Sequence, residues 1–127
     1  MSTTKNVVFE REEMASRLLA LDESIISVTL ANSRGEVLGM KYRSIAESFK
    51  PDKELLDRGG SLIAMISALI RQGEASYGDC KNITINFGKL GVGIIPIKSK
   101  EVIIALGLYP ETPMKQIYGK VARLLEQ

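Results

Sequence analysis

The spacing of apolar residues changes several times along this chain, and each change predicts a new element of secondary structure. Met14, Leu18 and Leu21 are separated by four and three positions, as they would be on one face of a helix. Acidic residues within 10–13 would occupy the first turn of that helix, where carboxylates interact favourably with the helix dipole. The first element is therefore predicted to be an amphipathic helix.

From Ile25 onwards apolar and polar residues alternate, which is the pattern of a strand. The segment 32–35 has the composition of a turn, and a second strand is predicted over Val37–Tyr42, so the two strands predict a hairpin. On the first strand we expect Ile26, Val28 and Leu30 on one face and Ile25, Ser27, Thr29 and Ala31 on the other.

A long helix is predicted over residues 52–72, after the proline at position 51 and before Gly73, which has the position of a C-terminal stop. Gly59 and Gly60 either break this helix or allow another backbone to approach it closely. The helix has more apolar positions than one stripe against a sheet requires, so one apolar face is left over. These positions are Leu55, Leu56, Leu62, Ile63, Met65, Ile66, Leu69 and Ile70.

Three strands in close succession are predicted next, over residues 83–87, 92–97 and 102–108. The last of them is almost continuously apolar, which predicts cover on both faces and a central place in the sheet. Pro96 cannot donate a ladder hydrogen bond, so we expect a bulge or irregular pairing in its strand.

A closing helix is predicted after Thr112, which we expect to be its N-cap, with Pro113 at the first helical position. The length of 127 residues suits one core of ordinary size, so we expect a single domain over residues 1–127 with a flexible N-terminal tail at 1–6. The apolar residues that repeat at helical spacing in the closing helix are Met114, Ile117, Val121 and Leu124.

Composition narrows the classes of function. With 45% apolar residues, 25% charged residues and a formal net charge of +2, the chain is typical of a globular domain and gives no electrostatic case for binding nucleic acid. No apolar stretch reaches the roughly 20 residues of a membrane span, and the N-terminus lacks the apolar core of a secretory signal. Cys80 is the only cysteine, which excludes an intrachain disulfide. We therefore expect a cytoplasmic protein without a membrane span.

Side chains with catalytic potential are scarce. The chain has no histidine, which removes the commonest general base and the usual imidazole ligand of zinc and iron sites. Cys80 lies between Asp79 and Lys81, whose charges have opposite effects on a thiolate, so an inert cysteine is favoured. The glycine-rich segment 88–93 precedes a strand instead of a helix, which predicts a hairpin turn and not a phosphate-binding loop. We predict no catalytic residue, no metal and no cofactor, and hence no enzyme.

Lys81, Lys98 and Lys100 are expected near one end of the three successive strands. They are candidates for contact with an anionic partner surface. Solubility and protection of a sheet edge explain them equally well.

The chain resembles the roadblock/dynein light chain family. The resemblance is carried by the hairpin within 24–42, which contains ANSRGEVLG, by the helix over 53–72, and by VGIIPIKSKEVIIALGL before the last helix. Profilin-like, longin and PAS-like domains share parts of this pattern and stay open as alternatives. The resemblance implies an α/β fold of the α+β sandwich type, with a five-stranded antiparallel sheet, the first and last helices on one face and the central helix on the other.

The resemblance also implies a homodimer, in which two central helices pack together and the strands at 83–87 pair edge to edge. Independently of the family, an unpaired apolar strand edge beside an exposed apolar helix is an aggregation hazard that self-association would cover. The alternative is that these residues all belong to the core of one chain. The expected interface residues are Leu62, Ile66, Leu69, Ile70, Ile83, Ile85 and Phe87.

Two functions of different classes stay open. The first, implied by the resemblance, is a non-enzymatic homodimeric protein-interaction module that acts as a platform or regulator for a small Ras-like GTPase. The second is a profilin-like or PAS-like sensory domain that binds an apolar small molecule between helix and sheet. In the first case nucleotide hydrolysis would belong to the partner, and the candidates for an arginine supplied in trans are Arg34, Arg43, Arg58 and Arg71.

Overall fold

The computed structural model describes residues 3–43 and 53–126, with side chains described for 10–43, 59 and 61–126. The order of its elements is the order that the sequence predicts, and β2 and β5 have the predicted bounds. The elements are α1 (Thr3–Leu19), β1 (Ile25–Ala31), β2 (Val37–Tyr42), α2 (Lys53–Tyr77), β3 (Ile83–Asn86), β4 (Gly91–Ile97), a 3-10 turn (Lys98–Lys100), β5 (Val102–Leu108) and α3 (Met114–Leu125).

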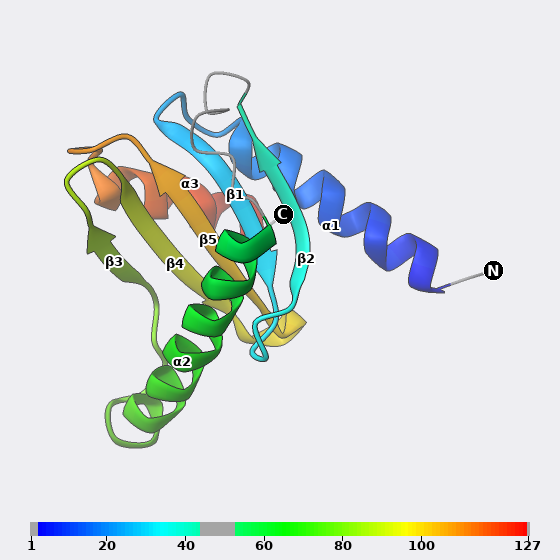
Figure 1. Ribbon diagram of the computed structural model, residues 1–127, viewed down its shortest axis with the longest axis vertical. Coiled ribbons are helices and arrows are strands. Elements are labelled where there is room, and N and C mark those ends of the chain that lie inside the picture. Colours follow the sequence, from blue (N-terminus) through cyan, green and yellow to red (C-terminus); the bar gives the residue numbers. More distant parts are fainter. Residues whose placement is uncertain (1–2, 44–52, 127) are drawn as a thin grey trace.

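The five strands form one antiparallel sheet in the order β2-β1-β5-β4-β3. Helices α1 and α3 lie on one face of this sheet, and α2 crosses the other face (Figure 1). Strand β5 is the middle strand, as its nearly continuous apolar sequence predicts. The predicted fold class is thus confirmed.

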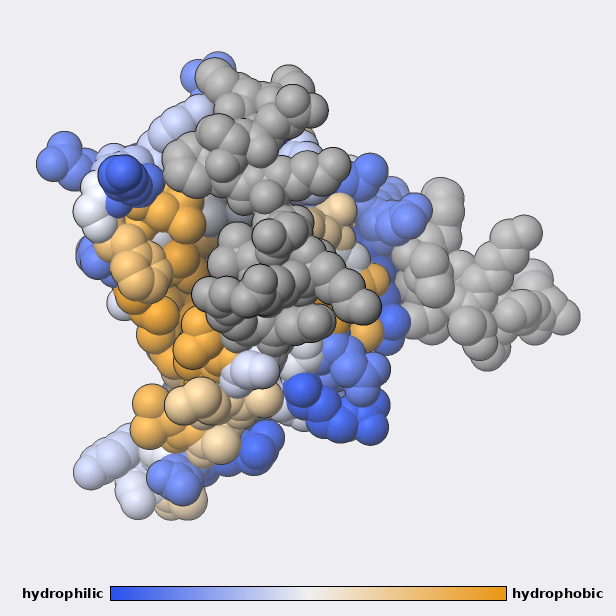
Figure 2. Space-filling view, viewed as in Figure 1, coloured by the Kyte–Doolittle hydropathy of each residue, from blue (hydrophilic) through white to orange (hydrophobic). Residues whose placement is uncertain are grey.

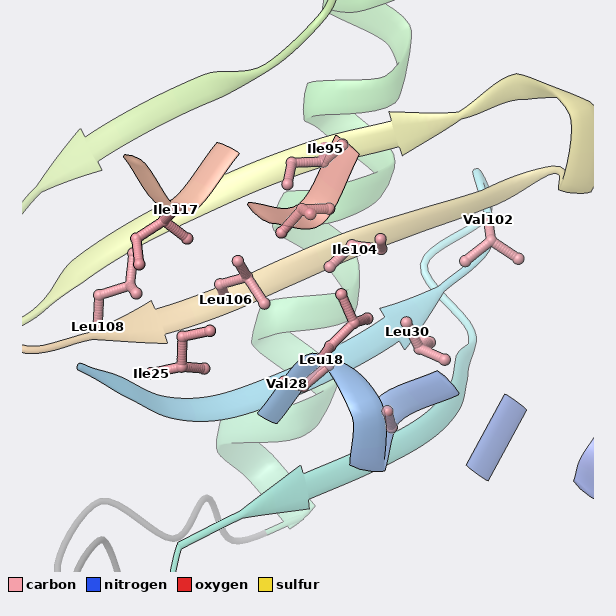
Figure 3. Packing of buried hydrophobic residues seen from close by; sticks show 12 residues of the cluster. Leu18, Ile25, Val28, Leu30, Ile95, Val102, Ile104, Leu106, Leu108 and Ile117 are labelled. Atoms are coloured by element: carbon pink, nitrogen blue, oxygen red, sulfur yellow. The ribbon is translucent and has the colours of Figure 1, made fainter. Parts of the chain in front are cut away.

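The main hydrophobic core lies between the sheet and the pair of helices α1 and α3 (Figure 3). Leu18 of α1 and Ile117 of α3 belong to one cluster with Ile104 and Leu106 of β5, and these four side chains are almost completely buried. Because full burial of a side chain of this size contributes about 1.5–3 kcal/mol, this layer is the principal source of hydrophobic stabilisation.

A smaller cluster lies under α2 on the opposite face of the sheet. Ile63 of α2 packs there with Ala31, Ile94 and Ile103 of the sheet. Ile66 of α2 is only partly buried at the margin of this cluster. Helix α2 therefore uses only part of its apolar surface to contact its own sheet.

The first strand differs from the prediction at Ile25. The pairing of β1 with β5 is irregular between Ile25 and Ser27, which interrupts the alternation of faces. Ile25 consequently lies in the main core with Val28 and Leu30, as Figure 3 shows, although strict alternation predicts it on the opposite face. Strict alternation predicts Ile26 on the same face as Val28 and Leu30. Ile26 is buried, but it does not belong to the main core cluster.

Helix α1 begins earlier than its apolar repeat suggests. It starts at Thr3, so residues 3–6 of the predicted flexible tail are helical. The acidic stretch 10–13 lies in the middle of the helix and not in its first turn, and Leu21 lies beyond its C-terminal end. Figure 1 shows α1 extending past the edge of the sheet, and the apolar repeat near Leu18 lies in a part of the helix that packs against it.

Helix α2 is continuous through Gly59 and Gly60, so these residues do not break it. It also continues past Gly73, and the predicted stop at that position is wrong. Gly78 ends the helix instead, because it has a positive φ of 88° and its N–H donates to the carbonyl of Glu74 at 3.2 Å. The predicted start at position 52 lies outside the described residues.

Two local predictions about proline and threonine are also wrong. Strand β4 pairs with β5 in unbroken register at Pro96, without the expected bulge. The pairing of β4 with β3 ends at Ile94. Among the described residues, β4 therefore pairs at Pro96 with β5 alone, and a position with one unpaired side tolerates proline. Thr112 does not cap α3, because the N-cap is Pro113 and the Thr112 hydroxyl donates to the carbonyl of Tyr109.

The corner between α1 and β1 is held by Arg43, which follows β2. Its guanidinium donates to the backbone carbonyls of Leu19, Asp22 and Ile25, with N–O distances of 2.6, 2.8 and 2.7 Å respectively. One of these carbonyls belongs to the last turn of α1, where it has no partner within the helix. Arg43 therefore fastens the end of α1 to the edge of the sheet.

The carboxylate of Asp22 joins the same corner to α3. It accepts a hydrogen bond from Lys120 Nζ at 2.6 Å, and further bonds from the backbone N–H and the hydroxyl of Ser24. All three interactions favour the charged carboxylate, so the pKa of Asp22 lies well below its usual value of 3.8.

We expect the free energy of unfolding to decrease as the pH falls through about 4 and below, because Asp22 then takes up a proton more readily in the unfolded chain than in the folded one. Above that range the stabilisation from Asp22 is fully present. In Asp22→Asn this contribution is absent, so its stability should decrease less steeply between about pH 5 and pH 2. Urea unfolding across this range measures the difference, and equal slopes for the two proteins would contradict the role given to Asp22.

Candidate interaction surface

Three exposed apolar residues form a stripe on the outer side of α2. Leu62, Met65 and Leu69 are separated by three and four positions, so their side chains lie on one side of the helix. They are 57%, 69% and 65% exposed, which is unusual for apolar side chains of this size. We call these three residues the α2 stripe.

An open edge of the sheet lies beside the α2 stripe. Strand β3 is at the end of the sheet and has β4 as its one neighbour among the described strands. Ile83 and Ile85 of β3 are half-buried on the α2 side, and a cleft lined by Leu69 and Ile83 adjoins both elements. Phe87 follows directly after β3 and is 60% exposed, although the sequence predicts it within the strand. Figure 2 shows apolar side chains gathered over this part of the molecule.

The α2 stripe together with Ile83, Ile85 and Phe87 is called the α2–β3 surface. Met65 is the most exposed residue of the stripe, and sequence reasoning leaves it out of the expected interface. Its spacing from the leucines on either side is the signal that could have identified it. Of the seven residues predicted for a dimer interface, Leu62, Leu69 and Phe87 are exposed, Ile66, Ile83 and Ile85 are half-buried, and Ile70 is buried at 9% exposure.

The three lysines predicted near one end of the sheet have different surroundings. Lys98 Nζ pairs with Glu74 at 2.8 Å and with Asp79 at 2.6 Å, and these bonds lower the pKa of both carboxyl groups. Lys100 instead lines a cavity on the side of α1 and α3, and Lys81 is exposed in the segment before β3. Lys98 therefore serves to fasten the turn after β4 to the end of α2.

A cavity of about 330 Å³ lies between α2 and the turn that joins β4 to β5. Ser67 in its wall is only 4% exposed, and its Oγ has no hydrogen-bond partner among the described residues. A buried hydroxyl without a partner lowers stability, so this position is unusual in an otherwise apolar wall. The cavity is lined from α2 by Ser67, Ile70, Arg71 and Glu74, from the sheet and its turn by Pro96, Ile97, Lys98, Glu101, Val102 and Ile103, and from the β1–β2 turn by Ser33.

We expect Ser67→Ala to raise the free energy of unfolding by about 1 kcal/mol, because it removes an unsatisfied hydroxyl and introduces a better helix former. Ser76→Ala is the matched control, since Ser76 is exposed on the same helix and reports helix propensity alone. Urea unfolding of both variants measures the comparison. A gain at Ser67 no larger than the gain at Ser76 would show that the buried hydroxyl has no cost.

The described residues lack the side-chain cluster of a metal centre and the long apolar helix of a membrane span. No group of three or more His, Cys, Asp or Glu side chains there could hold a metal ion. Cys80 is half-buried, with its backbone N–H bonded to the Glu74 carboxylate and its Sγ 3.7 Å from the carbonyl oxygen of Asn82. None of the described helices has the length and apolar character needed to cross a bilayer.

Comparison with solved structures identifies the fold. A Roadblock/LC7 domain from Streptomyces avermitilis matches with a TM-score of 0.64 and 15% sequence identity, over 91% of each chain. The gliding protein MglB from Thermus thermophilus matches with a TM-score of 0.59 and 16% identity, over 90% of this chain and 87% of that chain. An MglB with tetrameric arrangement matches with a TM-score of 0.61 and 17% identity, over 94% and 90%. No protein-family model and no curated protein matches the chain.

At such low identities the similarity concerns the fold and not a shared activity. It covers nearly all of the chain and of each similar structure. The chain has the fold of a roadblock domain, as the order of its predicted elements suggests.

Proposed function

We propose that this chain is a non-enzymatic, homodimeric protein-interaction module whose two copies meet through the α2–β3 surface. The observation that supports this most directly is the exposure of Leu62, Met65 and Leu69 beside an open sheet edge. Burial of each such side chain would contribute about 1.5–3 kcal/mol. A second copy of the chain provides this cover without requiring any other protein.

A two-fold axis suits this surface. In an isologous dimer both subunits use the same patch, so the α2 stripe meets its own copy and one β3 edge meets the other. Antiparallel pairing of the two β3 strands would join the sheets and remove an edge that is prone to aggregation. One protein with a similar fold is described as MglB with tetrameric arrangement, so assembly is compatible with this fold.

The partner that we propose for the dimer is a small Ras-like GTPase in the cytoplasm, as the resemblance to the roadblock family implies. This chain would supply a platform or regulator, and the partner would supply the nucleotide site. The segment 88–93 leads into β4, so it does not have the strand-loop-helix context of a phosphate-binding loop. Lys81 and Lys100 stay the exposed candidates for contact with an anionic surface of that partner.

Among the four arginines considered for a role in trans, two are engaged within the chain. Arg43 is held by three backbone carbonyls, and Arg34 forms an exposed ion pair with Glu36 at 3.1 Å. The side chain of Arg58 lies outside the described residues. Arg71 is exposed on α2 and forms no ion pair among the described residues, so it is the candidate that we retain.

Sedimentation across a wide dilution series tests the dimer. A species of twice 13.9 kDa that persists on dilution is the expected result. A monomer at every concentration would overturn the α2–β3 interface and would favour the small-molecule sensory alternative.

Small GTPases from the same organism, loaded either with GDP or with a non-hydrolysable GTP analogue, test the second half of the proposal. The immobilised chain should bind at least one of them with different affinities in the two nucleotide states. If no GTPase binds, or if each binds equally in its two nucleotide states, the GTPase is removed from the proposal. The proposed dimer does not depend on this result.

A further inference from the structure

We propose that the cavity between α2 and the β4–β5 turn is a binding site for a small zwitterion with an apolar side chain, of the class of the apolar α-amino acids. This site goes beyond the proposed dimer and does not depend on it. Its volume of about 330 Å³ lies at the lower end of the range of roughly 300–1,000 Å³ that is usual for small-molecule sites.

The body of the cavity is apolar. Ile70 of α2 and Ile103 of β5 are buried residues that line it, and Pro96 of β4 continues this lining. Ile97 and Val102 also border the cavity, but they pack in the main core on the opposite face of the sheet. Apolar side chains of this kind offer no hydrogen bond to a polar part of a ligand. This lining therefore favours a ligand with a branched or otherwise compact apolar side chain.

Ser67 supplies a polar atom within this apolar wall. Its Oγ is buried without a hydrogen-bond partner, and a serine hydroxyl can occupy three staggered χ1 positions. A ligand that offers a donor or an acceptor would satisfy this hydroxyl after a change of rotamer. Binding would thus remove the free-energy cost of the unpaired Ser67 hydroxyl, and this gain adds to the affinity for the ligand.

The charged residues of the rim determine the class of ligand. Four charged side chains line the cavity, and two of them, Glu74 and Lys98, are paired with each other at 2.8 Å. Arg71 and Glu101 are both exposed and have no ion pair among the described residues. One available positive group and one available negative group match a carboxylate and an ammonium on the same ligand better than they match a simple anion or cation.

The cavity and the α2–β3 surface lie on different flanks of α2. Ser67, Arg71 and Glu74 of the cavity follow one line along the helix, and the α2 stripe follows another. The cleft beside β3 shares only Ile70 and Glu74 with the cavity. A ligand in the cavity can therefore be tested in a dimer or in a monomer.

Titration of the full chain with L-leucine, followed through its backbone amide NMR signals, tests the site. We expect saturable shifts at Ser67, Arg71 and Ile103 in the millimolar range or below. The matched ligands are 4-methylpentanoate, which lacks the ammonium group, and 3-methylbutylamine, which lacks the carboxylate. Each should bind about tenfold more weakly than leucine, because it loses one charge-assisted hydrogen bond.

Variants of the chain provide a second test of the binding site. Arg71→Gln and Glu101→Gln should each weaken leucine binding about tenfold, and Ser67→Ala should weaken it several-fold although the free protein folds normally. Lys89→Gln, at an exposed lysine that does not line the cavity, is the control and should leave the affinity unchanged. The proposal is overturned by the absence of saturable shifts in the millimolar range, by equal affinity for the three ligands, or by shifts confined to Leu62 and Met65.

Discussion

Leu69→Asp is expected to convert the dimer into a folded monomer of 13.9 kDa. Leu69 is 65% exposed in the single chain and belongs to neither hydrophobic cluster, so the substitution leaves the monomer core intact. In an isologous dimer each interface would contain two aspartates, one from each subunit. Burial of two unpaired carboxylates should raise the dissociation constant at least about 100-fold, which sedimentation across a dilution series measures.

Two further variants on the same helix make this result specific. Ala75→Asp introduces the same charge at an exposed position roughly 110° around the helix from the stripe, and it should leave the dimer unchanged. Ile70→Asp places the charge at a buried position against the sheet and should prevent folding. Ile66 is less suitable for this test, because it packs partly against the cluster under α2. A Leu69→Asp protein that stays dimeric would show that the copies meet elsewhere.

The order of the elements could be predicted from the sequence, because each has a clear period. The almost unbroken apolar run over Val102–Leu108 places that strand in the centre of the sheet, as the sheet order confirms. The edge position of the strand at 83–87 is implied only by the family resemblance. The helical spacing of Ile117 and Val121 likewise marks the buried side of α3. These patterns are local, so they need no knowledge of the neighbouring elements.

The faces of α2 could not be assigned in the same way. Its apolar residues cover so much of the helix surface that periodicity does not separate the side against the sheet from the outer side. Sequence reasoning therefore predicts Ile70 at the interface although it is buried, and omits Met65 although it is exposed. Only the position of the helix on the sheet distinguishes the two sides.

Backbone geometry accounts for the other differences. The sequence predicts the helix stop at Gly73, but it is Gly78 that has the positive φ typical of a C-terminal cap. The irregularity between Ile25 and Ser27 has no signature in the apolar pattern, because Ile25 and Ile26 are both buried. The cavity with its unpartnered Ser67 depends on contacts between α2 and the β4–β5 turn, which sequence spacing does not describe.

Ile104→Ala should cause a large loss of stability, about 3 kcal/mol, and a decrease of roughly 10 °C in Tm. Ile104 is fully buried in the middle strand, where it pairs with Leu30 of β1 and with Ile95 of β4. The cavity left by the smaller side chain cannot collapse easily between two paired strands. Ile104→Val is the graded control, with an expected loss of about 1 kcal/mol.

The dependence of Tm on protein concentration separates this core from the proposed interface. A dimer that forms from folded chains has a Tm that rises with concentration, because association stabilises the folded state by mass action. Ile104→Ala should lower Tm at every concentration and keep this dependence, since the α2–β3 surface is unchanged. Leu69→Asp should instead abolish the dependence on concentration. Its Tm should be nearly the same as that of the wild-type protein at high dilution. Loss of the dependence in Ile104→Ala would show that the main core and the interface are coupled, contrary to the separate layers of the fold.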